Sequence, residues 1–203
     1  MRFLFSGTAS ILAFLFFIYS PAFAITENIN VFFNTPEEGV STSIISNPEV
    51  GLDDSLVNLI NSATPSDTIY AAFYEISDNS IMGALNTAAQ AGTNVYFIKD
   101  NSTSDTDYNT LDSSINKKKG GSIMHNKFLV IKDKAIWMGS ANPTRGGFIT
   151  GNNNALVIKS AELARIYEDE FNHMWSGNFG SNKTLDQNGT KVTVDGVDNE
   201  VFS

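Results

Sequence analysis

His125 and Lys127 are the residues of this 203-residue chain whose types and spacing most clearly indicate chemistry. They lie in a β-prone run, residues 123–131, and alternate residues of a strand share one face. An imidazole and an ammonium group at the start of a buried strand are unfavourable unless they have partners or a task. A neutral imidazole can attack phosphorus, and a neighbouring lysine can neutralise phosphoryl oxygens. The pair therefore indicates a site that handles a phosphate ester.

A second polar group follows at the far end of the hairpin that begins with this strand. It consists of Gly139, Ser140, Ala141 and Asn142. A glycine lets the backbone approach a ligand closely, and the Ser140 and Asn142 side chains can hydrogen-bond a phosphate or orient the histidine. Each element alone is weak, whereas their combination on adjacent hairpin strands is much more specific.

Together these residues resemble the signature of the phospholipase D superfamily, in which His-x-Lys, an Asp and Gly-Ser-x-Asn follow one another at fixed distances. The similarity runs from about Val31 to Gly180 and includes residues 32–39, the 152–154 asparagine run and residues 171–175. The resemblance implies phosphodiester hydrolysis or transfer through a phosphohistidine, without a metal or another cofactor. It also implies that His125 is the nucleophile or general acid, that Lys127 binds phosphate, and that Ser140 and Asn142 support the site.

The chain departs from this signature at the acidic positions. The aspartate of the family falls at Lys132, and the neighbouring Asp133 would lie on the opposite side of the strand unless the hairpin is bulged. A second carboxylate that orients the histidine in the family would be expected near Asn152–Asn154, but no carboxylate occurs between Asp133 and Glu162. A catalytically weak or inactive phosphate-binding half-subunit is therefore the alternative interpretation.

The resemblance implies two histidine motifs in a complete site, and this sequence has only one. The chain has 2 histidines, and His173 lies near the edge of the apolar face of the last predicted helix, where we expect a structural role. We therefore expect a homodimer or a second motif-bearing chain to complete the site. The C-terminal residues 192–202 also resemble the opening residues 27–32, which would suit the first half of a two-motif enzyme.

The elements that must position these residues alternate in type along the chain. Strands are expected at residues 30–33, 68–74, 94–98, 125–131, 135–138 and 155–158, with helices over 52–60, 81–89 and from Glu162 to Trp175. This order predicts an α/β fold, and the resemblance implies a phospholipase D-like mixed sheet flanked by helices on both faces. The polar segment 100–121 is expected to be a mobile surface loop, whose lysines 117–119 either steer an anionic substrate or form a solvated face.

The ends of the chain differ in composition from its middle. Residues 1–24 combine Arg2, an apolar run and an Ala-x-Ala site, which predicts a signal peptide and a secreted or periplasmic protein without an integral span after processing. Residues 25–180 form the predicted domain, and residues 181–203 a polar tail or linker, or the start of a second repeat. The chain has no cysteine, so its core must hold it together. Its net charge of −9 argues against broad polyanion binding, but both phospholipid and nucleic acid stay open as substrates.

Overall fold

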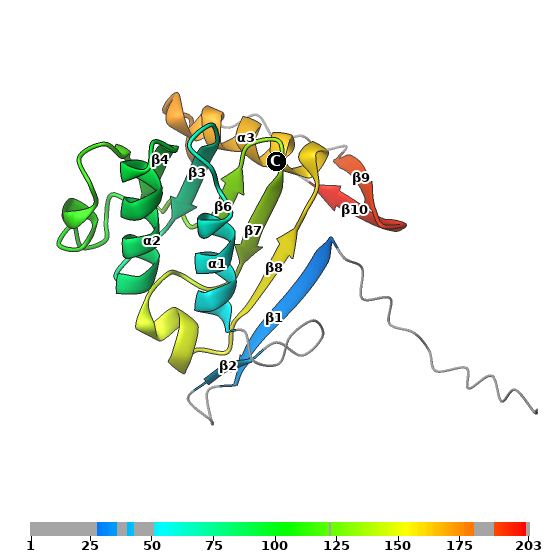
Figure 1. Cartoon of the computed structure of the whole chain (residues 1–203), viewed down its shortest axis with the longest axis horizontal. Coiled ribbons are helices and arrows are strands. Elements are labelled where there is room, and N and C mark those ends of the chain that lie inside the picture. The colour runs from blue at the N-terminus through cyan, green and yellow to red at the C-terminus, as the bar shows by residue number, and fades with distance from the viewer. Residues whose placement is uncertain (1–27, 36–39, 43–50, 122, 181–188, 202–203) are drawn as a thin grey trace, which may run out of the picture.

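The computed structural model describes residues 28–35, 40–42, 51–121, 123–180 and 189–201 (Figure 1). The predicted signal peptide lies outside these residues. An eight-stranded mixed sheet forms the centre, in the order β2-β1-β8-β7-β6-β3-β4-β5. Its strands are β1 (Ile29–Thr35), β2 (Val40–Thr42), β3 (Thr68–Phe73), β4 (Asn94–Lys99), β5 (Asn116–Lys119), β6 (Lys127–Ile131), β7 (Ala135–Gly139) and β8 (Asn154–Ile158).

Helices cover both faces of the sheet, which confirms the predicted fold class (Figure 1). Helices α1 (Leu52–Asn61) and α2 (Asn79–Gln90) pack on one face, and α3 (Ala161–Trp175) packs on the other. Alternation along each strand divides its side chains between two apolar clusters. In β6, for example, Leu129 and Ile131 join the cluster of α1 and α2, whereas Phe128 and Val130 join the cluster of α3.

The helices begin where the sequence places capping residues. The Asp78 side chain accepts hydrogen bonds from the backbone of Ser80 and Ile81 at the start of α2. Ser160 caps α3 in the same way through Leu163 N–H. Helix α1 has no side-chain cap, but it is fixed to the sheet through a buried hydrogen bond from Trp137 Nε1 to Ser55 Oγ, 2.9 Å long.

Strand directions bring distant segments to one end of the sheet. Strands β3, β4 and β5 are parallel, and β6 is antiparallel to β3 and β7. The chain therefore leaves β3, β4, β5 and β7 at the same end of the sheet at which it enters β6 and β8. Residues that follow or precede these strands meet there, although they are far apart in the sequence.

The segment 100–121 differs from the expected mobile loop. It contains a 3-10 helix, η1 (Tyr108–Thr110), and the edge strand β5. The buried Lys99 at the end of β4 donates hydrogen bonds to the carbonyl groups of Asp100 and Thr103 and forms a 3.1 Å ion pair with Asp105. A buried ammonium requires such partners, and they fold this segment back onto the sheet.

The three lysines of β5 also have protein partners. Lys117 donates to the Leu111 carbonyl at 3.0 Å, Lys118 donates to the Trp175 carbonyl, and Lys119 pairs with Asp105. Lysine-rich sequences are typical of exposed edge strands, where charge opposes pairing with another sheet. These contacts favour a structural role for the run over substrate steering.

The polar C-terminal segment contains a hairpin where the sequence suggested a linker. Strands β9 (Thr190–Val194) and β10 (Val197–Val201) pair with each other, and Val192 and Val194 are buried in the α3 cluster. Asp195, at the hairpin turn, accepts two hydrogen bonds from Asn28 just before β1. Whether this segment begins a second repeat stays a prediction.

Candidate active site

His125 and Lys127 lie at the end of the sheet where β6 begins. Lys127 is the first residue of β6 and stands opposite Phe73 of β3, whereas His125 precedes the strand and is exposed. The strand thus begins two residues later than the sequence predicts, so that the histidine belongs to the segment entering the sheet. The imidazole is therefore accessible from solvent while its neighbour is held by the sheet.

Tyr74 packs against both residues and was not identified from the sequence. Its ring meets the His125 ring edge-on, with centroids 5.1 Å apart, and Lys127 Nζ lies 5.7 Å from the Tyr74 ring centroid. The Tyr74 N–H donates to the Asn126 carbonyl at 3.1 Å, which extends the β3–β6 pairing beyond the strand ends. Tyr74 therefore limits the positions that the imidazole and the ammonium can take.

The Lys127 ammonium has both a structural contact and an unusual environment. Its Nζ donates to the His125 carbonyl at 3.0 Å. Burial lowers the pKa of Lys127, while the nearby Glu75 carboxylate raises it and so opposes part of that shift. The side chain is half-buried beside the exposed His125.

The second polar group lies at this end of the sheet because β7 ends, and β8 begins, where β6 begins. At Gly139, an added Cβ would collide with the Asn154 carbonyl oxygen and lie 2.9 Å from Ala155 Cα, so no other residue fits without a backbone shift. Ser140 Oγ donates to Asn153 Oδ1 at 2.8 Å and accepts from Asn154 N–H at 3.0 Å. Ser140 therefore holds β7 to the start of β8.

The asparagine run near position 153 is part of the same network. Asn153 Nδ2 donates to the Gly147 carbonyl, and Asn153 N–H donates to Oδ1 of the buried Asn34 on β1. Neutral amides thus occupy the place where the resemblance suggested a carboxylate. They can fix the backbone around Ser140, but they add no negative charge to the site.

Asn142 contacts a carboxylate from another part of the chain. Its Nδ2 donates to Glu75 Oε1 at 3.4 Å, and its buried Oδ1 has no hydrogen-bond partner among the described residues. Backbone hydrogen bonds reinforce this contact, because Ser77 N–H and Asp78 N–H both donate to the Pro143 carbonyl at 2.9 Å. Glu75 is therefore a site residue that sequence reasoning missed. The available signal was its position as the first charged residue after the buried strand β3.

Lys132 and Asp133 lie far from this site, at the turn between β6 and β7. Lys132 pairs with Glu168 of α3 at 2.9 Å, and Asp133 pairs with Arg165 at 2.6 Å. Both pairs stand at the opposite end of β6 from Lys127. Lys132, which stands where the resemblance places the family aspartate, therefore contacts α3 and lies at the far end of β6 from His125.

A hollow of about 260 Å³ opens beside the histidine on the α3 side. Its lining residues are Ile123, Met124, His125, Asn126, Met174, Phe179 and Gly180. Ile123 is 76 % exposed and has a φ of 60°, an unusual backbone conformation for a β-branched residue. The Asp100 carboxylate accepts the Met124 N–H and anchors the segment that enters the site. The hollow thus combines the apolar side chains of Ile123, Met174 and Phe179 with the polar groups of His125 and Asn126.

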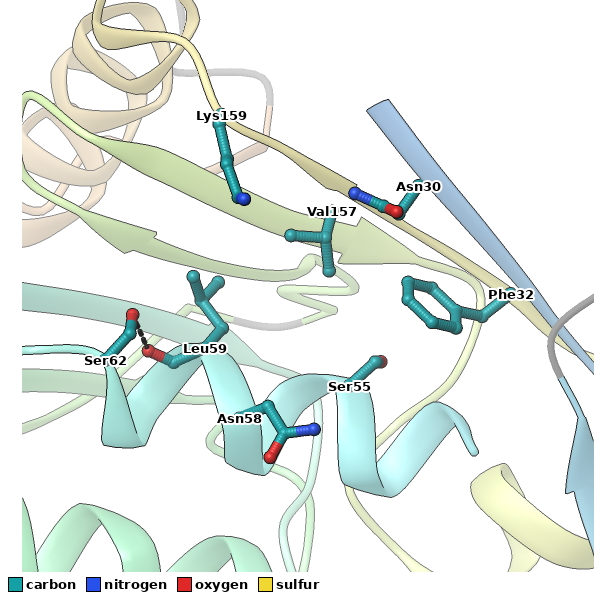
Figure 2. A pocket seen from close by; sticks show the side chains of 8 residues that line it. All are labelled: Asn30, Phe32, Ser55, Asn58, Leu59, Ser62, Val157 and Lys159. Carbon is teal, nitrogen blue, oxygen red and sulfur yellow. Dashed lines mark hydrogen bonds between the residues drawn. The ribbon is translucent and has the colours of Figure 1, made fainter. Parts of the chain in front are cut away.

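Another hollow, of about 200 Å³, lies between α1 and the β1 edge of the sheet and shares no residue with this site. In Figure 2, Phe32, Leu59 and Val157 line it, and Asn30, Asn58 and Lys159 bring polar groups to it. Lys159 follows β8 at the end of the sheet opposite His125. We therefore assign the candidate active site to the end that carries His125.

Two further observations concern metals and membranes. Among residues 28–35, 40–42, 51–121, 123–180 and 189–201, no three His, Cys, Asp or Glu residues are grouped as a metal site would require. In the same part of the chain, no helix combines the length and apolar character of a membrane span.

His173 is exposed in the last turn of α3, where a basic side chain favours the helix end.

Comparison with known sequences relates the chain to phosphodiester-processing proteins. Residues 56–175 match the family described as "Cardiolipin synthase, PLD-like domain". A phospholipase D of Rickettsia conorii is 30% identical over 128 residues, which cover 59% of this chain and 62% of the relative. A mitochondrial cardiolipin hydrolase of Chlamydomonas reinhardtii is 24% identical over 114 residues, with 53% and 51% covered. The chain thus spans about half to three fifths of the length of these curated relatives.

Solved structures share the fold at lower sequence identity. Nuc from Salmonella typhimurium, a phospholipase D family member, superposes with a TM-score of 0.59 at 21% identity, covering 73% of this chain and 93% of Nuc. NucT from Helicobacter pylori gives a TM-score of 0.60 at 22% identity, covering 73% of this chain and 96% of NucT. These likenesses establish the arrangement of the mixed sheet and its helices.

Proposed function

The chain belongs to the family of phospholipase D-like domains, and on that basis we propose that it hydrolyses phosphodiester bonds at the end of the sheet that carries His125. The observation that carries this proposal is the meeting of His125, Lys127 and Asn142 at the end of the sheet where β3 and β7 end and β6 begins. An exposed nucleophile, a half-buried cation and an amide donor are the groups that a phosphoryl transfer needs.

In the proposed reaction an imidazole nitrogen of His125 attacks phosphorus. A P–N bond forms while the P–O bond to the leaving group breaks, and a second histidine gives the leaving oxygen its proton. Water then attacks the phosphohistidine, the P–N bond breaks, and the second histidine takes a proton from that water. Lys127 and the free N–H of the Asn142 amide stabilise the charge that develops on the phosphoryl oxygens.

The second histidine would come from another chain. His173 is exposed on α3, and Asn178 N–H donates to its carbonyl, a contact that ends the helix. A two-fold axis between two copies would place two His125–Lys127 segments across one cleft. We propose a homodimer, with another motif-bearing chain as the alternative source. Export directed by residues 1–24 belongs to the same proposal.

The substrate is a phospholipid or a nucleic acid, and the wall of the site favours the phospholipid. Ile123, Met174 and Phe179 place apolar surface directly beside His125. The lysines of β5, which could have formed a basic channel, are bound to protein acceptors. Apolar surface suits a lipid ester, whereas a nucleic acid channel is typically basic.

The first prediction is that the purified protein cleaves phosphatidylcholine vesicles in preference to supercoiled plasmid when both are present with a chelator. Activity should persist in the chelator because the proposed nucleophile is an imidazole and not a metal-bound hydroxide. His125→Ala should reduce turnover to background, and His173→Ala is the matched control that should retain it. Equal rates for wild type and His125→Ala would contradict the enzymatic function and favour a phosphate-binding half-subunit. Preferential nicking of the plasmid would reverse the substrate assignment.

A further inference from the structure

The carboxylate of Glu75 lies at the candidate site, but it has no role in the proposed reaction. Glu75 follows β3 and is half-buried, although a carboxylate at a site for an anionic substrate is electrostatically unfavourable. In the described part of the chain, the amides of Asn34 and Asn153 occupy the region where the family resemblance suggested an acid. Position 132 lies at the opposite end of β6 and pairs with Glu168 of α3. Glu75 therefore supplies negative charge that neither of those positions provides.

The hydrogen bond to Asn142 determines how that amide is oriented. A carboxylate only accepts hydrogen bonds, so it can pair with the NH2 end of an amide and not with the carbonyl end. Asn142 Nδ2 accordingly faces Glu75 Oε1 at 3.4 Å and keeps a second N–H for another acceptor. The reverse orientation would place two oxygens against each other. The carboxylate thus selects the amide orientation in which an N–H is free for a phosphoryl oxygen.

The backbone keeps the two groups in place. The Pro143 carbonyl accepts hydrogen bonds from both Ser77 and Asp78, which ties the segment after β3 to the segment after β7. On the other side, an added Cβ at Gly147 would collide with the Asn142 carbonyl oxygen, so the helical turn η2 (Gly146–Thr150) packs directly against this segment. Two close backbone contacts therefore hold Asn142 near Glu75.

The charge of Glu75 also acts on Lys127. Phe73 pairs with Lys127, and the Tyr74 N–H continues this pairing to Asn126, which brings the residue after Tyr74 to the start of β6. Burial lowers the pKa of Lys127 and Glu75 raises it. Removing the carboxylate would leave burial unopposed and lower the pKa of Lys127 further.

We propose that Glu75 is a positioning residue of the phosphodiesterase site, orienting the Asn142 amide and helping to keep Lys127 in its ammonium form. This inference rests on the proposed function for its kinetic consequences, whereas its electrostatic consequence for Lys127 can be measured without turnover. Glu75 does not touch the reacting atoms in this assignment. It acts through the two side chains that bind the phosphoryl group.

The kinetic test, our second prediction, compares wild type with Glu75→Gln over a range of pH, using bis(p-nitrophenyl) phosphate and a chelator. We expect Glu75→Gln to lower kcat/KM roughly tenfold near neutral pH, because this is the typical effect of losing a hydrogen bond to a charged group. The deficit should widen as pH rises, because a lower Lys127 pKa moves the alkaline limb of the profile to lower pH. Glu162→Gln, the same change at the exposed start of α3, is the matched control and should leave the profile unchanged.

A second measurement follows the pH dependence of Lys127 acetylation by acetic anhydride, read by peptide mass spectrometry. The pH of half-maximal labelling should fall in Glu75→Gln and stay fixed in Glu162→Gln. Thermal unfolding checks that each variant is folded, and Glu75→Ala replaces the glutamine variant if that one unfolds. An unchanged labelling pH, a loss of activity that is independent of pH, or a faster variant would overturn the proposal. If the wild type lacks activity but labelling shifts, the proposed function fails while the electrostatic role of Glu75 holds.

Discussion

At the scale of residues, the site depends on contacts that fix polar side chains before any substrate arrives. Ser140 Oγ is held by Asn153 and Asn154, and Asn142 is held by Glu75. Tyr74 packs against the His125 ring. Reactive groups with fixed positions lose less entropy when the transition state forms. His125 itself is exposed, which suits a nucleophile that must reach a phosphorus atom brought from solvent.

Position 132 provides the third prediction, because the family aspartate would be unfavourable in this chain. Lys132 contacts Glu168, which also accepts a hydrogen bond from Tyr70. Lys132→Asp would replace this attraction by repulsion next to Glu168 and Asp133. We expect the free energy of unfolding to fall by about 1–2 kcal/mol, since a poorly solvated carboxylate loses its partner. Activity per folded molecule should stay the same, because the change lies at the far end of β6.

Chemical denaturation and phosphodiesterase assays check this expectation together. Lys132→Gln is the control, because it removes the ion pair without adding a second negative charge and should destabilise the protein less. A gain of activity in Lys132→Asp would contradict our placement of position 132 outside the site. It would instead support a direct role for the family aspartate.

At the scale of elements, the close approach of β7 and β8 provides the fourth prediction. Gly139 pairs with Ala155, and any side chain at position 139 would meet the backbone of Asn154 and Ala155. Gly139→Ala should therefore destabilise the protein by about 1–3 kcal/mol, as overpacking does in cores, and should lower activity by displacing Ser140. The measurement is the free energy of unfolding from urea denaturation.

Gly83 offers a matched control for this substitution. It is an exposed residue of α2, and an added Cβ there meets nothing within 4 Å. Gly83→Ala should stabilise the protein by roughly 0.5–1 kcal/mol through helix propensity. If the two alanine variants had similar stabilities, the packing between β7 and β8 would be looser than described.

Most elements could be predicted from the sequence because their signals are local. The buried strand 68–74, the helix over 81–89 and the β6–β7 hairpin all follow from patterns within a few residues, and the structure confirms them. Strand β5 could not be predicted in this way. Its sequence, Asn-Lys-Lys-Lys, has no strand pattern. Strand β5 pairs with β4 after a segment that is bound to the sheet by hydrogen bonds from the buried Lys99.

The candidate site was predictable where its residues are close in sequence and not where they are distant. Lys127 and Ser140 belong to one hairpin with a recognisable spacing. Tyr74 and Glu75 reach the same place only because β3 lies beside β6, which depends on the strand order of the whole sheet. Local patterns carry no information about that order. The resemblance therefore implies a carboxylate near Asn153, whereas the carboxylate that contacts Asn142 follows β3.

At the scale of the whole molecule, a single histidine motif stands at the end of the sheet that carries the candidate site. The chain as a whole is acidic, with a net charge of −9. Self-association must overcome the repulsion between two such chains, so any homodimer contact needs apolar surface or charge compensation. The end of the sheet that carries His125 provides apolar surface through the exposed Ile123. Higher salt should screen the repulsion and favour association.

The fifth prediction separates a shared site from two independent ones. If each site takes His125 from both copies, co-expressed wild-type and His125→Ala chains form active sites only in wild-type pairs. Activity should then follow the square of the wild-type fraction, so an equal mixture retains about one quarter of full activity, whereas independent sites would retain about one half. Mixtures with His173→Ala chains should keep full activity and control for the effects of mixing.

Sedimentation of the same mixtures links activity to the oligomeric state. We expect specific activity to fall on dilution in step with the dimer fraction, because a dissociated chain lacks the proton donor for the leaving oxygen. A linear dependence on the wild-type fraction, with full activity in the monomer, would mean that one chain completes the reaction alone. The leaving oxygen would then need a proton donor within the chain, and His125 would be a whole site rather than half of one.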